Sequence, residues 1–176
     1  MQYFILKQDP RVNGPKVPAN IAYSPLKRIF SIEEANELEE AMAFPVHNKT
    51  DWEYPAVIER PIYLVDSAVK AVLSRYNKKM VWNAVMLNDL EKAEQHIYWL
   101  MGVPFVSCVS KQSTFHADKS IKNLVLDESE INHRSIFKVD GLLEQYLVVS
   151  LNVAESLLRR EIYGIELTAV QTDRGE

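Results

Sequence analysis

Residues 136–170 read IFKVDGLLEQYLVVSLNVAESLLRREIYGIELTAV, and this stretch decides the fold. The apolar, partly β-branched runs at 136–139 and 146–149 predict two strands, and Asp140-Gly141 between them is typical of a turn. No catalytic signature lies on the stretch. Residues 136–170 are therefore informative about the fold and give no evidence for a reaction.

The second half of this stretch predicts a helix and a closing strand. Ser150 is typical of a helix N-cap, because its hydroxyl can accept a hydrogen bond from one of the first free helical amides. Apolar residues then recur at helical spacing between Val153 and Leu158. Gly164 can take the left-handed conformation that ends a helix, and the alternation at 165–170 predicts a strand. As an exposed edge, that strand would permit pairing with another chain.

Length and composition indicate a single domain over residues 1–176. The chain has 176 residues and 47% hydrophobic content, enough to bury a core without disulfides or a structural metal. The net charge of -4 disfavours nucleic-acid binding over the whole surface and favours a basic partner. The single cysteine, Cys108, excludes an intramolecular disulfide and fits a reducing compartment. No segment is as long as a membrane span, and no basic region precedes the apolar run at residues 3–6, so we expect a cytoplasmic protein. The sequence leaves the oligomeric state open.

Two helix starts are expected before residue 80. Ser31-Ile32-Glu33-Glu34 is a capping box, in which the serine and the second glutamate satisfy each other's backbone amides. The helix that it opens is expected to run through Met42 and to end before Pro45. Asp66 is expected to cap a second helix that runs through Arg75.

Short apolar runs elsewhere predict the remaining strands of a sheet. The Pro-rich segment 10–25 is expected to lie across the surface, residues 110–120 to form a polar loop, and residues 127–134 to form a charged connection. Strands outnumber helices and do not alternate with them regularly. The expected fold is therefore an α+β domain with a mostly antiparallel sheet and about three helices. The expected strands lie at residues 3–6, 62–65, 80–87, 97–103, 105–106 and 124–126.

Several of these segments together resemble family eleven of the immunity proteins of bacterial polymorphic toxin systems, formerly a domain of unknown function. The resemblance covers roughly residues 80–170 and is carried by pattern and order. The residues that carry it are Tyr98-Trp99-Leu100-Met101-Gly102-Val103, Ser120, residues 124–128, residues 136–141, and the run from Val148 through Arg160 to Leu167. The resemblance implies a stoichiometric inhibitor that binds a cognate toxin domain, often encoded beside it, and catalyses no reaction.

Two groups of residues are candidates for the toxin-binding surface. The first is a negative face on the capped helix, which a basic toxin surface would complement, although the helix dipole also favours acidic residues there. The second is an aromatic loop, because exposed aromatics form interface anchors, whereas buried rings would cover the core. The acidic group comprises Glu33, Glu34, Glu37, Glu39 and Glu40, and the aromatic group comprises Trp52, Tyr54 and Tyr63.

Other classes of function have weaker support in the sequence. Cys108, His116 and Asp118 are residue types of a thiol catalyst, but closeness in sequence does not bring them together in space, and burial of Cys108 would exclude this chemistry. The histidines lack the helical spacing of a zinc site, and no Gly-rich phosphate loop is present. We therefore expect no catalytic residue, no metal and no cofactor. The alternative to an inhibitor is a small-molecule or peptide binding module, with a pocket between the sheet and the Pro-rich loops.

Overall fold

The computed structural model of the chain describes residues 1–21, 28–46 and 53–174. Strands dominate it (43%) and four helices accompany them in the described ranges, so the expected α+β class is confirmed. The strands form three sheets, and one of the sheets is curled into a half-barrel. None of the helices in these ranges is both long and apolar enough to cross a membrane.

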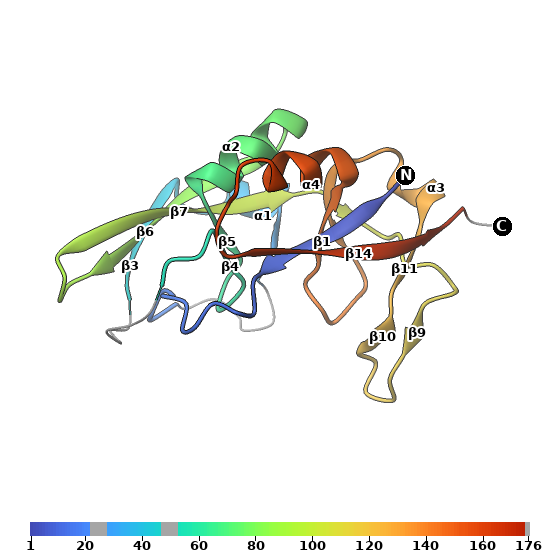
Figure 1. Cartoon of the computed structure of the whole chain (residues 1–176), viewed down its shortest axis with the longest axis horizontal. Helices are drawn as coiled ribbons and strands as arrows, with labels where there is room; N and C mark the ends of the chain where they lie inside the picture. The colour runs from blue at the N-terminus through green and yellow to red at the C-terminus, as the bar shows by residue number, and fades with distance from the viewer. Residues whose placement is uncertain (22–27, 47–52, 175–176) are drawn as a thin grey trace.

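The first sheet brings the two ends of the described chain together (Figure 1). Its strands are, in spatial order, β11 (Val125–Asp127), β14 (Ile165–Asp173), β1 (Tyr3–Gln8), β13 (Leu147–Ser150), β12 (Ile136–Val139) and β8 (Phe105–Val106). β1 runs antiparallel to both β13 and β14, and β12 runs antiparallel to β13. The outer strands β11 and β8 pair in parallel with β14 and β12. β14 is therefore not the outermost strand: β11 pairs with its end at Gln171–Asp173, and the partners of residues 165–170 are in β1.

The second sheet is built around a long hairpin that projects at one end of the molecule (Figure 1). Its strands are, in spatial order, β3 (Ala41–Pro45), β6 (Val81–Asp89), β7 (Glu94–Val103), β5 (Leu64–Asp66) and β4 (Val57–Ile58), and β2 (Phe30–Ser31) also pairs with β7. The β6–β7 hairpin is antiparallel, whereas β3 and β2 join the sheet in parallel. The expected mostly antiparallel sheet is thus two larger sheets of mixed direction. The third sheet is a hairpin of β9 (Thr114–Phe115) and β10 (Ile121–Asn123), which corrects the prediction of a plain loop there.

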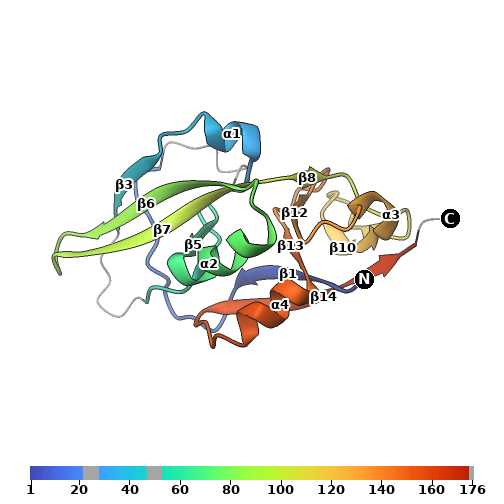
Figure 2. The ribbon, with the colours of Figure 1, turned by 90° about the horizontal axis from the view of Figure 1, so that it is seen from above.

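Two of the helices lie side by side over the sheets (Figures 1 and 2). The helices are α1 (Ile32–Asn36), α2 (Ser67–Tyr76), α3 (Glu128–Ile131) and α4 (Leu151–Leu158). α2 and α4 are the adjacent pair. The N-cap predicted for α2 is confirmed, because the amide of Val69 donates to the Asp66 carboxylate at 2.8 Å. α3 lies in the expected charged connection, so the described part of the chain has one helix more than predicted.

The largest apolar cluster joins both sheets beneath α2 and α4. Val69 and Leu73 of α2 and Val153 and Leu157 of α4 are fully buried in it. Each helix contributes one apolar face, as the spacing of its sequence predicts, and burial of such side chains stabilises the fold by about 1.5–3 kcal/mol each. Their partners in the two sheets include Val65, Met101, Ile136, Leu147 and Val149.

The stretch that decides the fold has the predicted order of elements, with a difference at each end of the helix. β12, β13, α4 and β14 follow one another as expected. α4 ends at Leu158 with Arg159 as its C-cap, so Gly164, whose φ is 82°, does not end the helix as predicted and lies instead directly before β14. Ser150 occupies the N-cap, but its hydroxyl is buried and makes no hydrogen bond with any described residue. The amide of Leu151 donates instead to the carbonyl of Gln2 at 2.9 Å. The predicted serine cap bond is therefore wrong, and backbone bonding to Gln2, the residue before β1, holds this end of α4.

Candidate functional site

α1 is shorter than the sequence predicts. Its capping box is present: the amide of Glu34 donates to Ser31 Oγ at 3.2 Å, and the amide of Ser31 donates to the Glu34 carboxylate at 2.9 Å. The helix nevertheless ends at Asn36, and the residues expected to continue it through Met42 lead into β3. The prediction of a helix through residue 42 is therefore wrong.

Contacts with the second sheet explain why the helix stops. Asn83 of β6 donates through Nδ2 to the carbonyls of Ala35 at 3.1 Å and Glu39 at 3.0 Å, so it satisfies backbone groups at the end of the helix. Gly102 of β7 lies against the same turn, because a Cβ placed there would stand 2.6 Å from the Cβ of Ala35. Both partners are distant in sequence. Helical periodicity in residues 31–42 carries no information about them.

The five acidic candidates, called the acidic segment from here on, do not form one helix face. Glu33 and Glu34 belong to α1, Glu37 is its C-cap, and Glu39 and Glu40 lie in the turn before β3. All except Glu34 are exposed, and Glu34 is held by the capping box. The sequence thus identified an exposed acidic region but placed it on the wrong element.

A hollow lies beside the acidic segment. Its volume is about 390 Å³, and its lining combines carboxylates with apolar side chains. Met42 is buried and Phe44 half-buried, whereas Ala43 between them is exposed. Such a surface can accept both the charge and the aliphatic part of a long basic side chain. The lining residues are Glu37, Leu38, Glu39, Met42, Ala43 and Phe44.

The aromatic candidates are arranged differently from an exposed anchor loop. Tyr63 is buried, and its hydroxyl donates to the carbonyl of Leu6 at 2.7 Å. The half-buried ring of Tyr54 stacks on His96, with 3.5 Å between the ring centroids. Trp52 lies outside the described residues. Tyr63 and Tyr54 therefore pack against the protein itself, and of these two neither is an exposed ring.

The Pro-rich segment is anchored to the body of the protein by a buried ion pair. We call residues 9–20 the strap. Lys16 Nζ lies 2.5 Å from Asp89 Oδ2, and the two side chains are 1% and 0% exposed. The amide of Lys16 donates to the carbonyl of Glu53 at 2.7 Å, and the amide of Glu53 donates to Gly14 at 3.1 Å. The expectation that this segment lies across the surface therefore misses its burial at Lys16; residues 22–25 lie outside the described ranges.

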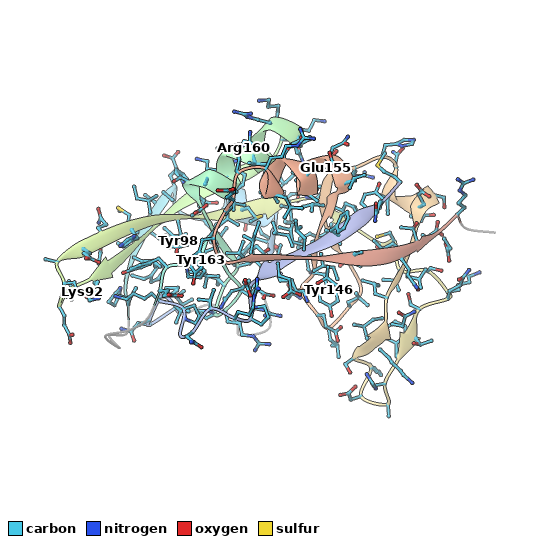
Figure 3. All side chains as sticks on the ribbon, viewed as in Figure 1. Lys92, Tyr98, Tyr146, Glu155, Arg160 and Tyr163 are labelled. Atoms are coloured by element: carbon cyan, nitrogen blue, oxygen red, sulfur yellow. The ribbon has the colours of Figure 1, made fainter. Side chains whose placement is uncertain are left out.

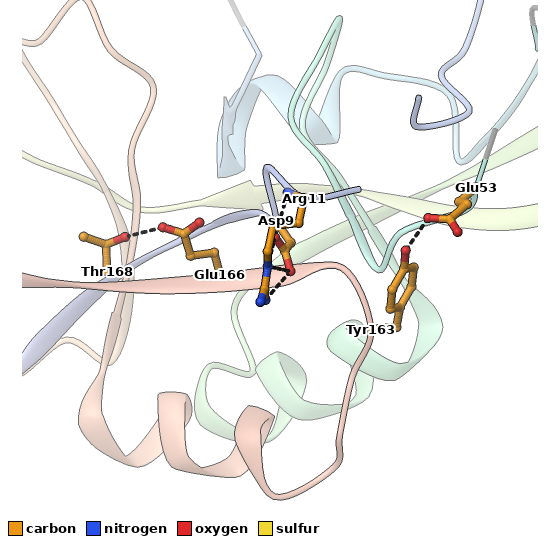
Figure 4. A network of polar contacts seen from close by, with 6 residues as sticks. All are labelled: Asp9, Arg11, Glu53, Tyr163, Glu166 and Thr168. Carbon is orange, nitrogen blue, oxygen red and sulfur yellow. Dashed lines mark hydrogen bonds and ion pairs between the residues drawn. The ribbon is translucent and has the colours of Figure 1, made fainter. Parts of the chain in front are cut away.

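Polar contacts at the start of the strap fix its turn. Arg11 donates to the Asp9 carboxylate from its backbone amide at 2.9 Å and from Nη2 at 2.8 Å, and these bonds hold the pKa of Asp9 below its ordinary value. The Tyr163 hydroxyl hydrogen-bonds to the Glu53 carboxylate, which raises the pKa of Tyr163. Figure 4 shows both contacts near the start of β14. The first contact lies within the strap, the second joins residue 53 to the residues just before β14, and both indicate a structural role.

A pocket of about 470 Å³ lies between the strap, the loop joining β4 to β5 and the loop joining β12 to β13. Arg28 and Arg60 line it together with Pro10, Pro15 and Tyr146, and we call it the arginine pocket. Tyr146 lies on the opposite side of β1 and β14 from Glu155 of α4 and from Arg160 just after that helix in the view of Figure 3. The sequence suggested a pocket beside the Pro-rich loops, but neither arginine was identified, because isolated arginines carry no spacing signal.

The residue types of a thiol catalyst are not arranged as an exposed reactive site. Cys108 is fully buried, and burial raises the pKa of its thiol to about 11. His116 and Asp118 are exposed in the connection between β9 and β10, where the Ser120 hydroxyl donates to Asp118 at 2.6 Å. These bonds lower the pKa of Asp118. Across residues 1–21, 28–46 and 53–174, no group of three or more His, Cys, Asp or Glu residues could hold a metal ion.

Comparison with known proteins adds no family assignment to this geometry. No protein-family model matches the chain, and a search of curated proteins finds no significant match. The resemblance to immunity family eleven therefore stays a prediction from the residues that carry it.

Proposed function

We propose that this chain is an immunity protein that binds a cognate bacterial toxin domain in the cytoplasm of the producing cell and neutralises it without catalysing a reaction. The acidic segment beside its hollow is the observation that carries the proposal. Glu37 and Glu39 line the hollow next to apolar side chains, and Glu40 is exposed beside Glu39 in the turn before β3. A basic toxin surface would meet complementary charge at the rim and apolar contact in the hollow.

One residue, Gly102, both belongs to the strings that carry the resemblance and contacts the helix that begins the acidic segment. The string Tyr98–Val103, which carries part of the resemblance, forms the end of β7. Gly102 in this string is the residue against which Ala35 of α1 packs. The other strings that carry the resemblance lie largely in β12, β13 and α4, most of whose apolar residues are buried. The residues shared with the family would thus build the framework that presents the acidic segment.

Charge would act mainly on the rate and specificity of binding. Exposed carboxylates accelerate the encounter with a basic partner, and this effect weakens as salt screens the charges. The apolar part of the hollow would contribute to the lifetime of the complex, because burial of apolar area does not depend on ionic strength in the same way. An inhibitor of this kind needs only shape and charge complementary to the toxin.

The first test is co-purification of the tagged protein with the product of the neighbouring open reading frame, together with rescue of growth on co-expression. Tight binding with rescue is the expected result. Absence of both binding and rescue with any adjacent product would contradict the proposal, and a ligand screen would then test the alternative of a small-molecule or peptide binding module.

The surface is tested by reversing charge in pairs. Glu37→Lys with Glu40→Lys is expected to weaken toxin binding at least about tenfold, chiefly through a slower association rate at low salt. The matched control is Glu130→Lys with Glu155→Lys, two exposed acidic residues on other helices. Equal effects of the two pairs would show that net charge matters and that the acidic segment is not the contact surface.

A further inference from the structure

The arginine pocket contains two cations that form no ion pair with a described residue. Arg28 is half-buried and Arg60 exposed, and neither guanidinium forms an ion pair or a hydrogen bond with another described residue. Burial, followed by the like charge of Arg60, lowers the pKa of Arg28, and the opposite charge of Glu59 raises it by less. Two guanidiniums in the lining of one pocket favour a carboxylate there, because a guanidinium can bind a carboxylate through two parallel N–H groups.

The acidic residues that line the same pocket are engaged by the backbone. Glu59 accepts a hydrogen bond from the amide of Gln8 at 3.2 Å. Glu144 accepts one through Oε1 from the amide of Ile121 at 2.8 Å. Each carboxylate is therefore fixed by its own backbone contact and lies outside ion-pair distance of both arginines.

Apolar side chains also line the pocket. The rings of Pro10 and Pro15 and the phenol of Tyr146 supply apolar contact. Glu144 Oε2 and Gln145 Oε1 also belong to lining residues, but both atoms are buried, so a ligand in the pocket does not reach them. The pocket thus offers partners for a carboxylate and for an apolar body.

We infer that the arginine pocket binds a carboxylate carried on an apolar body, the chemistry shared by the terminal residue of a peptide and a free N-acylated amino acid. Arg28 and Arg60 hold the carboxylate. A singly charged carboxylate fits better than a phosphate dianion, because Glu59 and Glu144 in the same lining would repel a second negative charge. This site is independent of the proposed toxin contact, which lies at α1 and the turn before β3.

Calorimetric titration with two matched pairs of probes tests the inference. The first pair is N-acetyl-phenylalanine and its neutral amide, and the second is the pentapeptide Ala-Gly-Ala-Gly-Phe with a free or an amidated carboxyl end. At least one free acid is expected to bind, at least about tenfold more tightly than its amide. Binding of the pentapeptide alone would identify a peptide end as the ligand, and binding of both acids would show that a small molecule suffices.

Variants locate the binding in the pocket. Arg28→Gln and Arg60→Gln are each expected to weaken binding of the acid at least about tenfold, whereas Arg75→Gln, on the exposed end of α2, leaves it unchanged. Arg28→Lys keeps the charge but loses the paired N–H groups, so it should bind with intermediate affinity. If Arg28→Gln fails to fold, as thermal unfolding would reveal, the exposed Arg60 carries the test. Equal binding of acid and amide, no binding of any probe at millimolar concentration, or unchanged binding by Arg60→Gln would overturn the inference.

Discussion

The acidic segment presents carboxylates alone, whereas the arginine pocket presents two guanidiniums beside two carboxylates, and the protein supports the two sites by different physical means. The acidic segment is seated by close packing, with Ala35 against Gly102, and by the amide of Asn83. One wall of the arginine pocket is the strap, which is held by the buried pair of Lys16 and Asp89. The first support depends on volume and the second on charge.

This difference teaches which changes should affect each surface. A segment that is held by close packing should keep its position when pH or salt changes, but it should be displaced when a methyl group is added to the packed surface. A buried ion pair tolerates salt as well, because it is poorly screened, but not the loss of one partner, which leaves a buried charge uncompensated. Substitutions at the two supports should therefore separate the surfaces, and the following predictions run from the largest effect to the smallest.

Lys16→Met should have the largest effect on stability. It removes one partner of a buried ion pair while keeping most of the side-chain volume, so the free energy of unfolding should fall by about 3–5 kcal/mol. Urea denaturation measures this change. Lys16→Met combined with Asp89→Asn should lose less than the sum of the single variants, because the pair is removed together. A loss below about 1 kcal/mol in the single variant would show that the pair does not hold the strap.

The same pair makes a prediction for alkaline pH. The hydrogen bond to Asp89 raises the pKa of Lys16 above its ordinary value of 10.5. The stabilisation is therefore complete below pH 10.5 and is lost as the pH rises through the higher folded-state pKa. Wild-type protein should lose stability more steeply than Lys16→Met above this pH, and parallel curves for the two proteins would contradict the assignment. The comparison cancels the titration of the tyrosines that both proteins share except Tyr54, whose pKa burial raises and Lys16 lowers.

Gly102→Ala should destabilise the protein by an intermediate amount and displace α1. The added Cβ would stand 2.6 Å from the Cβ of Ala35 and 3.0 Å from the carbonyl oxygen of Ser31, an overpacking that costs about 1–3 kcal/mol. Toxin binding should weaken, while titration of the arginine pocket with N-acetyl-phenylalanine stays unchanged. Adding Ala35→Gly removes the nearer clash and should recover part of the stability. If the stability does not recover, the strain comes from the contact with the carbonyl oxygen of Ser31.

Ser31→Ala should cost less, about 1 kcal/mol, because it removes the side-chain half of the capping box. Hydrogen exchange should show faster exchange at the amide of Glu34, which loses its acceptor. Ser31→Thr keeps a hydroxyl and serves as the control. An unchanged exchange rate in the alanine variant would mean that packing alone holds α1 in place.

The elements predicted correctly are those whose signals are local. In residues 136–170 the turn and the apolar runs lie within a few residues of the backbone they control, and β12, β13, α4 and β14 follow as predicted. The capping box at Ser31 is equally local and is present. Two details failed: Gly164 does not end α4, and the Ser150 cap is replaced by a bond to Gln2 at the other end of the chain.

The features that the sequence did not predict depend on partners distant in the chain. The end of α1 is set by Asn83 and Gly102, and the burial of Lys16 depends on Asp89, 73 residues away. The arginine pocket joins residues from the strap to Tyr146. Composition indicated an acidic surface, but position on the surface requires the tertiary contacts that periodicity does not contain.

The smallest change in stability should follow removal of charge from the two surfaces themselves. Glu39, Glu40 and Arg60 are exposed, so Glu39→Gln with Glu40→Gln, and separately Arg60→Gln, should alter the free energy of unfolding by less than about 0.5 kcal/mol. Urea denaturation measures the stability of each variant, and the binding titrations measure its affinity. A binding surface should lose affinity while stability is kept, because its side chains are not required by the fold. If Arg60→Gln instead destabilises the protein by more than about 1 kcal/mol, Arg60 supports the fold of the strap. Its guanidinium would then be a structural group, and the proposed role in binding a carboxylate would lose its support.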